Sequence, residues 1–209
     1  MAGGCNDRCA VPNAGLDSQR RTLRIVLALN LAMFVVEAVA GWHAGSIALQ
    51  ADALDFLGDS ANYAIALYVL TRSVAWRAGT ALLKGVTMFG FGLFLLGLGI
   101  QKALSGTVPG APVMGVVGTL ALLVNVVAAV LLFRFRGGDA NLRAVWLCSR
   151  NDALGNLAVL AAAAGVALLA SPWPDLLVGF GIAGLAIWSG LSVVRQARAE
   201  LRSAYPATV

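Results

Sequence analysis

The stretch ALSGTVPGAPVMGVVGTLALLVNVVAAVLLF, from Ala103 to Phe133, contains no charged residue and lies between Lys102 and Arg134. A helix needs about 20 apolar residues to cross the hydrocarbon core of a bilayer, so this interval can hold a complete span. The rest of the chain has the same character, because 59% of all residues are hydrophobic, 12% are charged and the mean hydropathy is +0.82. The composition therefore predicts an integral membrane protein and excludes an ordinary soluble domain.

Similar apolar runs recur along the chain, separated by prolines, glycines and clusters of charge. These breaks predict an all-α integral membrane protein, a bundle of six transmembrane helices. The predicted spans are 24–43, 47–71, 80–101, 112–133, 143–170 and 173–194. We expect a disordered tail at 1–19, the transmembrane domain at 20–195 and a short tail at 196–209.

The basic residues predict the orientation of the bundle. Thirteen of the fifteen Lys and Arg residues fall on one side of the predicted spans, Lys102 falls on the other side, and Arg150 lies within a span. Because segments rich in Lys and Arg stay in the cytoplasm, we expect both termini there, in a bacterial inner membrane. The net charge of +5 does not indicate nucleic-acid binding, since the basic residues are dispersed over short segments.

Two short stretches place metal-ligand side chains inside predicted spans. DFLGD carries Asp55 and Asp59, and CSRND carries Cys148 and Asp152. Residues four apart lie on one face of a helix, so each pair can point at one ion. The helical rise also gives the two pairs overlapping depths in the bilayer. Ionisable groups inside a membrane cost roughly 2.5 to 3.5 kcal/mol each on insertion scales, so the default inference from these four residues is a function.

Other polar residues have two interpretations each. Asp52 shares the face of the first pair but lies nearer the outer end, which favours a helix start or the permeation path over direct ligation. Asn30 and Glu37 lie seven residues apart on one helix face, where a structural hydrogen bond and a place in the permeation path are equally supported. Arg150 points away from the second pair and needs a carboxylate partner, for which Glu37 is a candidate.

The run GSIALQADALDFLGDSANY at 45–63, together with the second four-spaced pair followed by ALGNLAVL, resembles the cation diffusion facilitator family of divalent-metal transporters. The resemblance covers the membrane portion almost end to end. It implies exchange of a divalent metal, most often zinc, for protons at a tetrahedral site between the second and fifth spans. By position it implies Asp55, Asp59 and Asp152 as ligands, while Cys148 stands where the family usually has histidine.

The resemblance is weaker in two other regions. Family members usually carry a cytoplasmic C-terminal domain that holds the dimer, and many have a histidine-rich loop between the fourth and fifth spans. Here only residues 195–209 follow the last predicted span, and the loop is RFRGGDANLR, so we expect a minimal, membrane-only form. If a homodimer forms, glycine-rich faces on 80–101 and 173–194 would allow close approach. The favoured alternative is that these two spans pack on each other within one chain.

Counting charge predicts a proton-coupled mechanism. Three carboxylates and one thiolate, all ionised, would leave a net charge of −4 + 2 = −2 around a divalent ion, so at least one group should keep or regain a proton. Because ligands deprotonate to bind, metal binding would release protons. Mixed oxygen and sulfur donors suit Zn²⁺, with Co²⁺ and Cd²⁺ next. The expected function is metal export by proton antiport, with no cofactor besides the transported ion.

Two other classes compete with this interpretation. An intramembrane metalloenzyme could use the same groups to activate water, but catalytic zinc sites are usually rich in histidine. The only histidine, His43, lies at the outer end of the first span. A proton-linked carrier of organic cations would need an aromatic-lined cavity, and near the pairs the sequence offers only Phe56, Tyr63 and Trp146. In the N-terminal tail, Cys5 and Cys9 suit either a weak metal-capturing arm or a plain tail.

Overall fold

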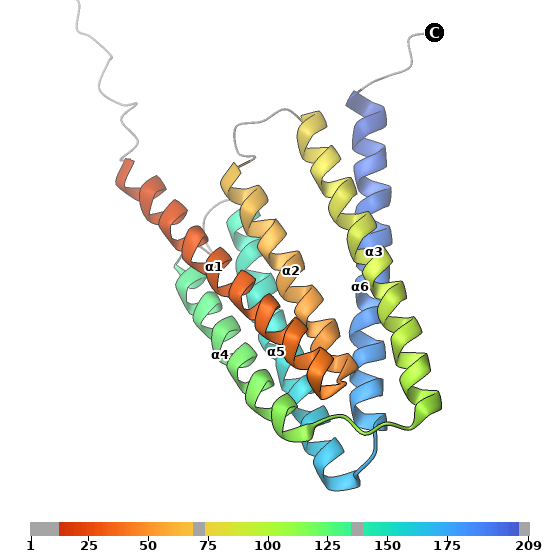
Figure 1. The fold of residues 1–209 in the computed structure, drawn as a ribbon. Helices are drawn as coiled ribbons and strands as arrows, with labels where there is room; N and C mark the ends of the chain where they lie inside the picture. Colours follow the sequence, from red (N-terminus) through yellow and green to blue (C-terminus); the bar gives the residue numbers. More distant parts are fainter. Residues whose placement is uncertain (1–12, 69–73, 135–139, 205–209) are drawn as a thin grey trace, which may run out of the picture.

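A computed structural model describes residues 13–68, 74–134 and 140–204, and for some of them, 140–148 included, only the backbone. These residues form helices and no strand, which confirms the predicted all-α fold (Figure 1). The six helices are α1 (Asn13–Ala44), α2 (Ile47–Tyr68), α3 (Val74–Ser105), α4 (Ala111–Phe133), α5 (Ala140–Leu169) and α6 (Trp173–Ala204).

Successive helices run in opposite directions through the bundle. The start of α1 and the end of α6 lie at the same end of the molecule, as the charge pattern requires of two termini on one side (Figure 1). Among the described residues, every helix except α2 is long and apolar enough to cross a membrane. Because α2 carries three aspartates in 22 residues, it falls short in apolarity and not in length. The protein is therefore a multi-pass membrane protein.

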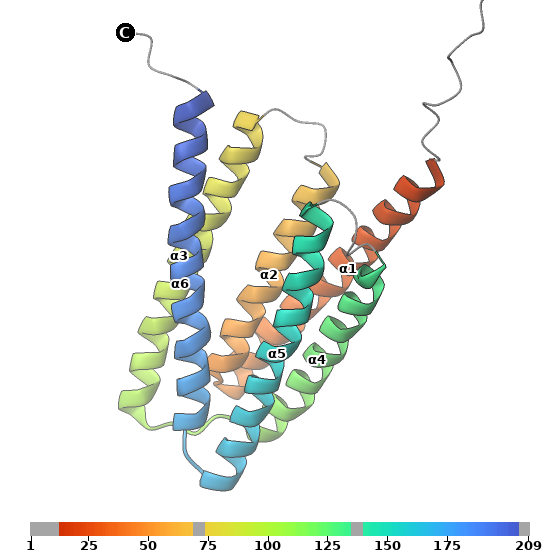
Figure 2. The same cartoon turned by 180° about the vertical axis from the view of Figure 1, so that it is seen from behind.

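The helices fall into two groups. α1 packs against α2 and α4, and α5 packs against the same two helices, so these four form a closed ring. α3 and α6 pack most extensively on each other and touch the ring mainly through α2 and α5. Figure 2 shows this pair standing beside the other four helices. The space between the pair and the ring is where polar side chains of α2 and α5 gather.

Glycines let α3 and α6 approach until their backbones touch. A Cβ atom added at Gly92 would lie 2.6 Å from Ile187 Cγ1, and one added at Gly190 would lie 2.8 Å from the carbonyl oxygen of Gly85. The expectation that the two spans pack on each other within one chain is thus confirmed at these positions. Four other glycines of the two faces meet nothing within 4 Å, so a dimer contact there stays a prediction: Gly90, Gly97, Gly181 and Gly184.

The start of α2 is capped by a carboxylate from another helix. Asp175, in the first turn of α6, accepts hydrogen bonds from the amide of Ile47 at 2.8 Å and the amide of Ala48 at 3.1 Å. Its Oδ1 atom also accepts a 2.5 Å hydrogen bond from the hydroxyl of Ser46. The first amides of a helix have no partner within the helix and attract negative charge, so this contact fixes the start of α2 against α6.

Three helices extend well beyond their predicted spans, and one of them is α3, which runs from Val74 to Ser105 where the prediction was 80–101. α1 begins at Asn13, so residues 13–19, expected to be disordered, are helical, and α6 continues to Ala204. Apolar patterning marks where the chain meets the bilayer surface. A helix can continue past that surface, because its backbone hydrogen bonds are internal and its side chains become polar. The predicted tail boundary at 196 therefore falls inside a helix.

Candidate metal centre

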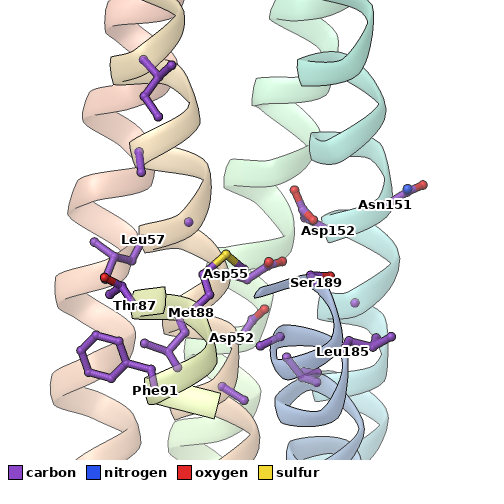
Figure 3. Close-up of a pocket in the computed structure, with 18 of the residues that line it drawn as sticks. Asp52, Asp55, Leu57, Thr87, Met88, Phe91, Asn151, Asp152, Leu185 and Ser189 are labelled. Atoms are coloured by element: carbon purple, nitrogen blue, oxygen red, sulfur yellow. The ribbon is translucent and has the colours of Figure 1, made fainter. Parts of the chain in front are cut away.

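A cavity of about 710 Å³ lies between the helical ring and the α3–α6 pair. Its polar lining includes Asp52 and Asp55 from α2 and Asp152 from α5, and most of the remaining lining is apolar. Figure 3 shows these three side chains projecting into the space between the helices, whereas Asn151 points away from it. The site thus holds several carboxylates that share one cavity inside a membrane-spanning bundle.

The first predicted pair and the aspartate of the second pair come together. Asp55 and Asp59 lie one turn apart on α2, and the carboxyl of Asp152 interacts with both of them. The Oδ2 atom of Asp152 is buried and makes no hydrogen bond. Carboxylates offer only acceptor oxygens, so such a cluster is stable in a membrane only with protons or a cation among its members.

Asp59 differs from its two neighbours, because it does not line the cavity and is only 7% exposed. Tyr63, one turn further along α2, donates a hydrogen bond of 3.1 Å to Asp59 Oδ2. The same hydroxyl lies 2.8 Å from the hydroxyl oxygen of Ser149 on α5. In the sequence Tyr63 is notable only as an aromatic side chain near the pairs. Its i+4 spacing from Asp59 was the signal that could have identified it as an orienting partner.

Asp52 is held by a chain of amides from two other helices. Asn156 of α5 donates a 2.6 Å hydrogen bond to Asp52 Oδ2, and Asn125 of α4 donates a 2.9 Å hydrogen bond to Asn156 Oδ1. All three side chains are buried. Since α2 begins at Ile47 and Ser46 with Asp175 caps it, the interpretation of Asp52 as a helix-start residue is wrong. Its alternative place, along the cavity, is the one that the structure supports.

Asn30 and Glu37 have different surroundings despite sharing a helix face. Asn30 donates a 2.9 Å hydrogen bond to the carbonyl oxygen of Val26, which is the structural role that sequence analysis allowed. Glu37 is fully buried, and neither of its carboxylate oxygens makes a hydrogen bond. Its nearest acidic neighbour is Asp52, within hydrogen-bonding reach.

Several predicted contacts fall outside the described residues. The backbone of Cys148 belongs to α5, one turn before Asp152, but its side chain is not described, so its role as a ligand stays a prediction. The same holds for Arg150 and its proposed partner, and for Cys5 and Cys9. Among the side chains that the structure describes, no three His, Cys, Asp or Glu residues are grouped closely enough to hold a metal ion.

Comparison with known proteins places this arrangement in a family. Residues 23–202 match the family model described as the cation efflux transmembrane domain. The cation-efflux pump FieF of Pectobacterium carotovorum is 31% identical over 184 residues, covering 78% of this chain and 59% of that protein. The metal cation efflux system protein CzcD of Cupriavidus metallidurans is 26% identical over 169 residues, covering 74% of this chain and 53% of its own length.

A third relative is the cadmium, cobalt and zinc/H(+)-K(+) antiporter of Bacillus subtilis, which is 23% identical over 194 residues, covering 85% of this chain and 62% of the antiporter. The chain thus spans between half and two thirds of the length of these relatives. The family match reaches all six helices, from Leu23 in α1 to Arg202 in α6, and includes the cavity between them. The chain therefore belongs to the cation diffusion facilitator family, through its cation efflux transmembrane domain.

Proposed function

We propose that the protein exports divalent metal cations from the cytoplasm in exchange for protons, through a site where α2 meets α5. The observation that carries this proposal is the meeting of Asp55 and Asp152, from different helices, on one cavity inside the bundle, with Asp59 beside them. Ionisable groups at this depth are expensive and mark ion pathways. The names of the relatives, which are pumps and antiporters of metal cations, support the same function.

Zn²⁺ is the ion that the proposed ligands favour, with Co²⁺ and Cd²⁺ next. The proposed ligand set is Asp55, Asp59, Asp152 and Cys148. Three carboxylates and a thiolate form a four-ligand set of mixed hardness, which suits Zn²⁺ better than Mg²⁺ or Ca²⁺. The family to which the chain belongs is one of cation-efflux proteins, which argues against the alternative of an intramembrane metalloenzyme.

Proton exchange follows from the acidic character of the cluster. Asp152 interacts with both Asp55 and Asp59, and ionised carboxylates this close repel one another when no cation is present. We therefore expect the cluster to hold protons when the site is empty. A divalent cation displaces those protons, because a carboxylate must be ionised to bind it. Metal binding on one side of the membrane would then be obligatorily coupled to proton uptake on the other side. An inward proton gradient would drive the metal outward.

Transport into proteoliposomes under an imposed pH gradient tests the proposal. We expect uptake of Zn²⁺, Co²⁺ and Cd²⁺ by the wild type, and loss of that uptake in Asp59→Ala and Asp152→Ala, both of which should remain folded by size-exclusion chromatography. Asp17→Ala is the matched control, since it removes an exposed carboxylate of α1 away from the cavity.

Each alternative has its own result in this assay. Variants that still exchange metal at the wild-type rate would remove Asp59 and Asp152 from the site. A wild type that binds metal without moving it would favour the metalloenzyme. A wild type that moves an organic cation but no metal would favour the organic-cation carrier, for which the mostly apolar cavity wall offers room.

A further inference from the structure

Glu37 is a buried carboxyl group that the proposed metal ligands do not account for. It lies about two turns before the end of α1, its exposed fraction is 0%, and both of its carboxylate oxygens are buried without a hydrogen bond. It does not line the cavity. An ionised carboxylate in such a place carries a large desolvation penalty unless a cation or a donor compensates it. Glu37 therefore needs a proton or a partner of opposite charge.

Among the side chains that the structure describes, the titratable groups that act on Glu37 supply no opposite charge. α1 packs against α2 and α4. From α2 the groups that act on Glu37 are Asp52, within hydrogen-bonding reach, and the more distant Asp55. α4 carries no titratable residue between Ala111 and Phe133. Both of these described neighbours are acidic, and a pair of buried carboxylates in contact cannot both ionise without a strong energetic penalty.

The hydrogen bonds from Asn125 through Asn156 favour ionisation of Asp52 over ionisation of Glu37. Asn125 donates to Asn156, and Asn156 donates to Asp52 Oδ2 at 2.6 Å, so hydrogen-bond donation runs towards Asp52. An accepting carboxylate is stabilised by such a donor. Glu37 receives no donor from the side chains that the structure describes. Since two carboxylates have only acceptor oxygens, the contact between Glu37 and Asp52 becomes a hydrogen bond when Glu37 holds a proton and donates it.

We propose that Glu37 and Asp52 form a proton-binding pair, separate from the metal ligands, that gives up one proton when a divalent cation enters the cavity and regains it when the cation leaves. This proposal rests on the proposed metal–proton exchange, and it identifies the residues that carry one of the exchanged protons. Asp52 lines the cavity and Glu37 does not, so Asp52 connects Glu37 to the cavity. The O–H bond of Glu37 breaks as one forms on Asp52, and that proton then passes to water in the cavity. The pair is left with two negative charges, which the cation offsets.

The number of protons released for each bound metal ion directly tests whether this pair gives up a proton. Calorimetric titration of detergent-solubilised protein with Zn²⁺, in buffers of different protonation enthalpy, gives that number. Glu37→Gln keeps the size and can donate its amide N–H to Asp52, but it has no acidic proton. We expect the variant to bind Zn²⁺ and to release about one proton fewer per metal ion than the wild type.

Two variants serve as controls. Asp17→Asn makes the same acid-to-amide change at an exposed position of α1 and should leave the proton count unchanged. Glu37→Asp retains the acid and should restore most of the release. If Glu37→Gln does not purify as a folded protein, Asp52→Asn tests the pair from its other member, with the same loss expected.

The outcome that overturns the inference is a Glu37→Gln or Asp52→Asn variant that releases as many protons as the wild type. Failure of the proposed function gives a different result, because the wild type itself would then bind no Zn²⁺ or release no proton with it.

Discussion

Tyr63 links a predicted metal ligand to the helix that carries the other half of the site. Its hydroxyl contacts Asp59 on its own helix and Ser149 on α5, and the ring is 1% exposed. Groups that orient a ligand in this way are worth a large part of a site's affinity. The position of the Asp59 carboxylate therefore depends on a residue that would not itself touch the ion.

Tyr63→Phe tests this dependence. The change removes one hydroxyl from a buried contact, and we expect the affinity for Zn²⁺ to fall about 10-fold or more, as measured by competition with a chromogenic chelator. Thr119→Val is the control, because it removes an exposed hydroxyl that bonds only to the carbonyl oxygen of Gly115 within α4. An unchanged affinity in Tyr63→Phe would mean that other contacts suffice to hold Asp59.

Cys148 would decide the metal preference if its thiolate binds the ion. We expect Cys148→His to shift the order of preference from Cd²⁺ towards Zn²⁺ and Co²⁺, because imidazole is a harder donor than thiolate. Cys148→Ser should weaken binding of all three ions. Equilibrium binding of each ion to the purified variants measures both effects. If Cys148→Ser leaves affinity and order as they are, the ligand set is three aspartates and water.

Sequence could predict which carboxylates meet but not how they are held. The four-residue spacing on α2 and the depth of Asp152 on α5 were sufficient to predict that Asp152 lies close to Asp55 and Asp59. The amide chain to Asp52 could not be read in the same way, because Asn125 and Asn156 lie on different helices and no spacing along the chain relates them. Hydrogen bonds between helices depend on rotation and depth, which packing decides.

At the scale of elements, the contact between α3 and α6 depends on where a glycine faces. Gly92 lies against Ile187 and the carbonyl oxygen of Ala183, whereas Gly90, half a turn earlier, meets nothing within 4 Å. The two residues share a helix and a residue type. They differ in whether a methyl group would collide with the neighbouring helix, so they form a matched pair for an experiment.

Gly92→Ala should lower the stability of the protein by about 1 to 3 kcal/mol, since a collision in a close-packed contact forces the helices apart. Gly90→Ala should be neutral or stabilising by up to about 1 kcal/mol, because alanine is the better helix former. Thermal unfolding in detergent, followed by circular dichroism, compares the two. Equal effects of the two substitutions would contradict the packing described for this pair.

The ends of the elements show where patterning stops being informative. The predicted span 112–133 is nearly identical to α4, whose ends coincide with a proline near its start and a basic residue after its end. α1 and α6 extend well beyond the predicted spans, since their outer turns are polar. Apolar runs predict membrane boundaries, and the ends of helices that leave the membrane are set by other interactions.

At the scale of the whole molecule, the six antiparallel helices and the charge pattern make a prediction about orientation. Thr107 lies in the connection between α3 and α4, at the opposite end of the bundle from Asp17 near the start of α1. In a background with Cys5, Cys9 and Cys148 replaced by serine, Thr107→Cys should react with a membrane-impermeant maleimide added to intact cells, and Asp17→Cys should not. The reverse pattern would place both termini outside.

The acidity of α2 also bears on how the protein is made. Its three aspartates together oppose entry of an isolated helix into lipid by roughly 8 to 10 kcal/mol on insertion scales. α1 runs antiparallel to α2, packs along it and is joined to it by only Gly45 and Ser46. During synthesis the most favourable route is for the two helices to leave the translocation channel as one hairpin, with the acidic face of α2 kept from lipid until α5 arrives. The residues that suit α2 to a cation thus make its insertion depend on its neighbours.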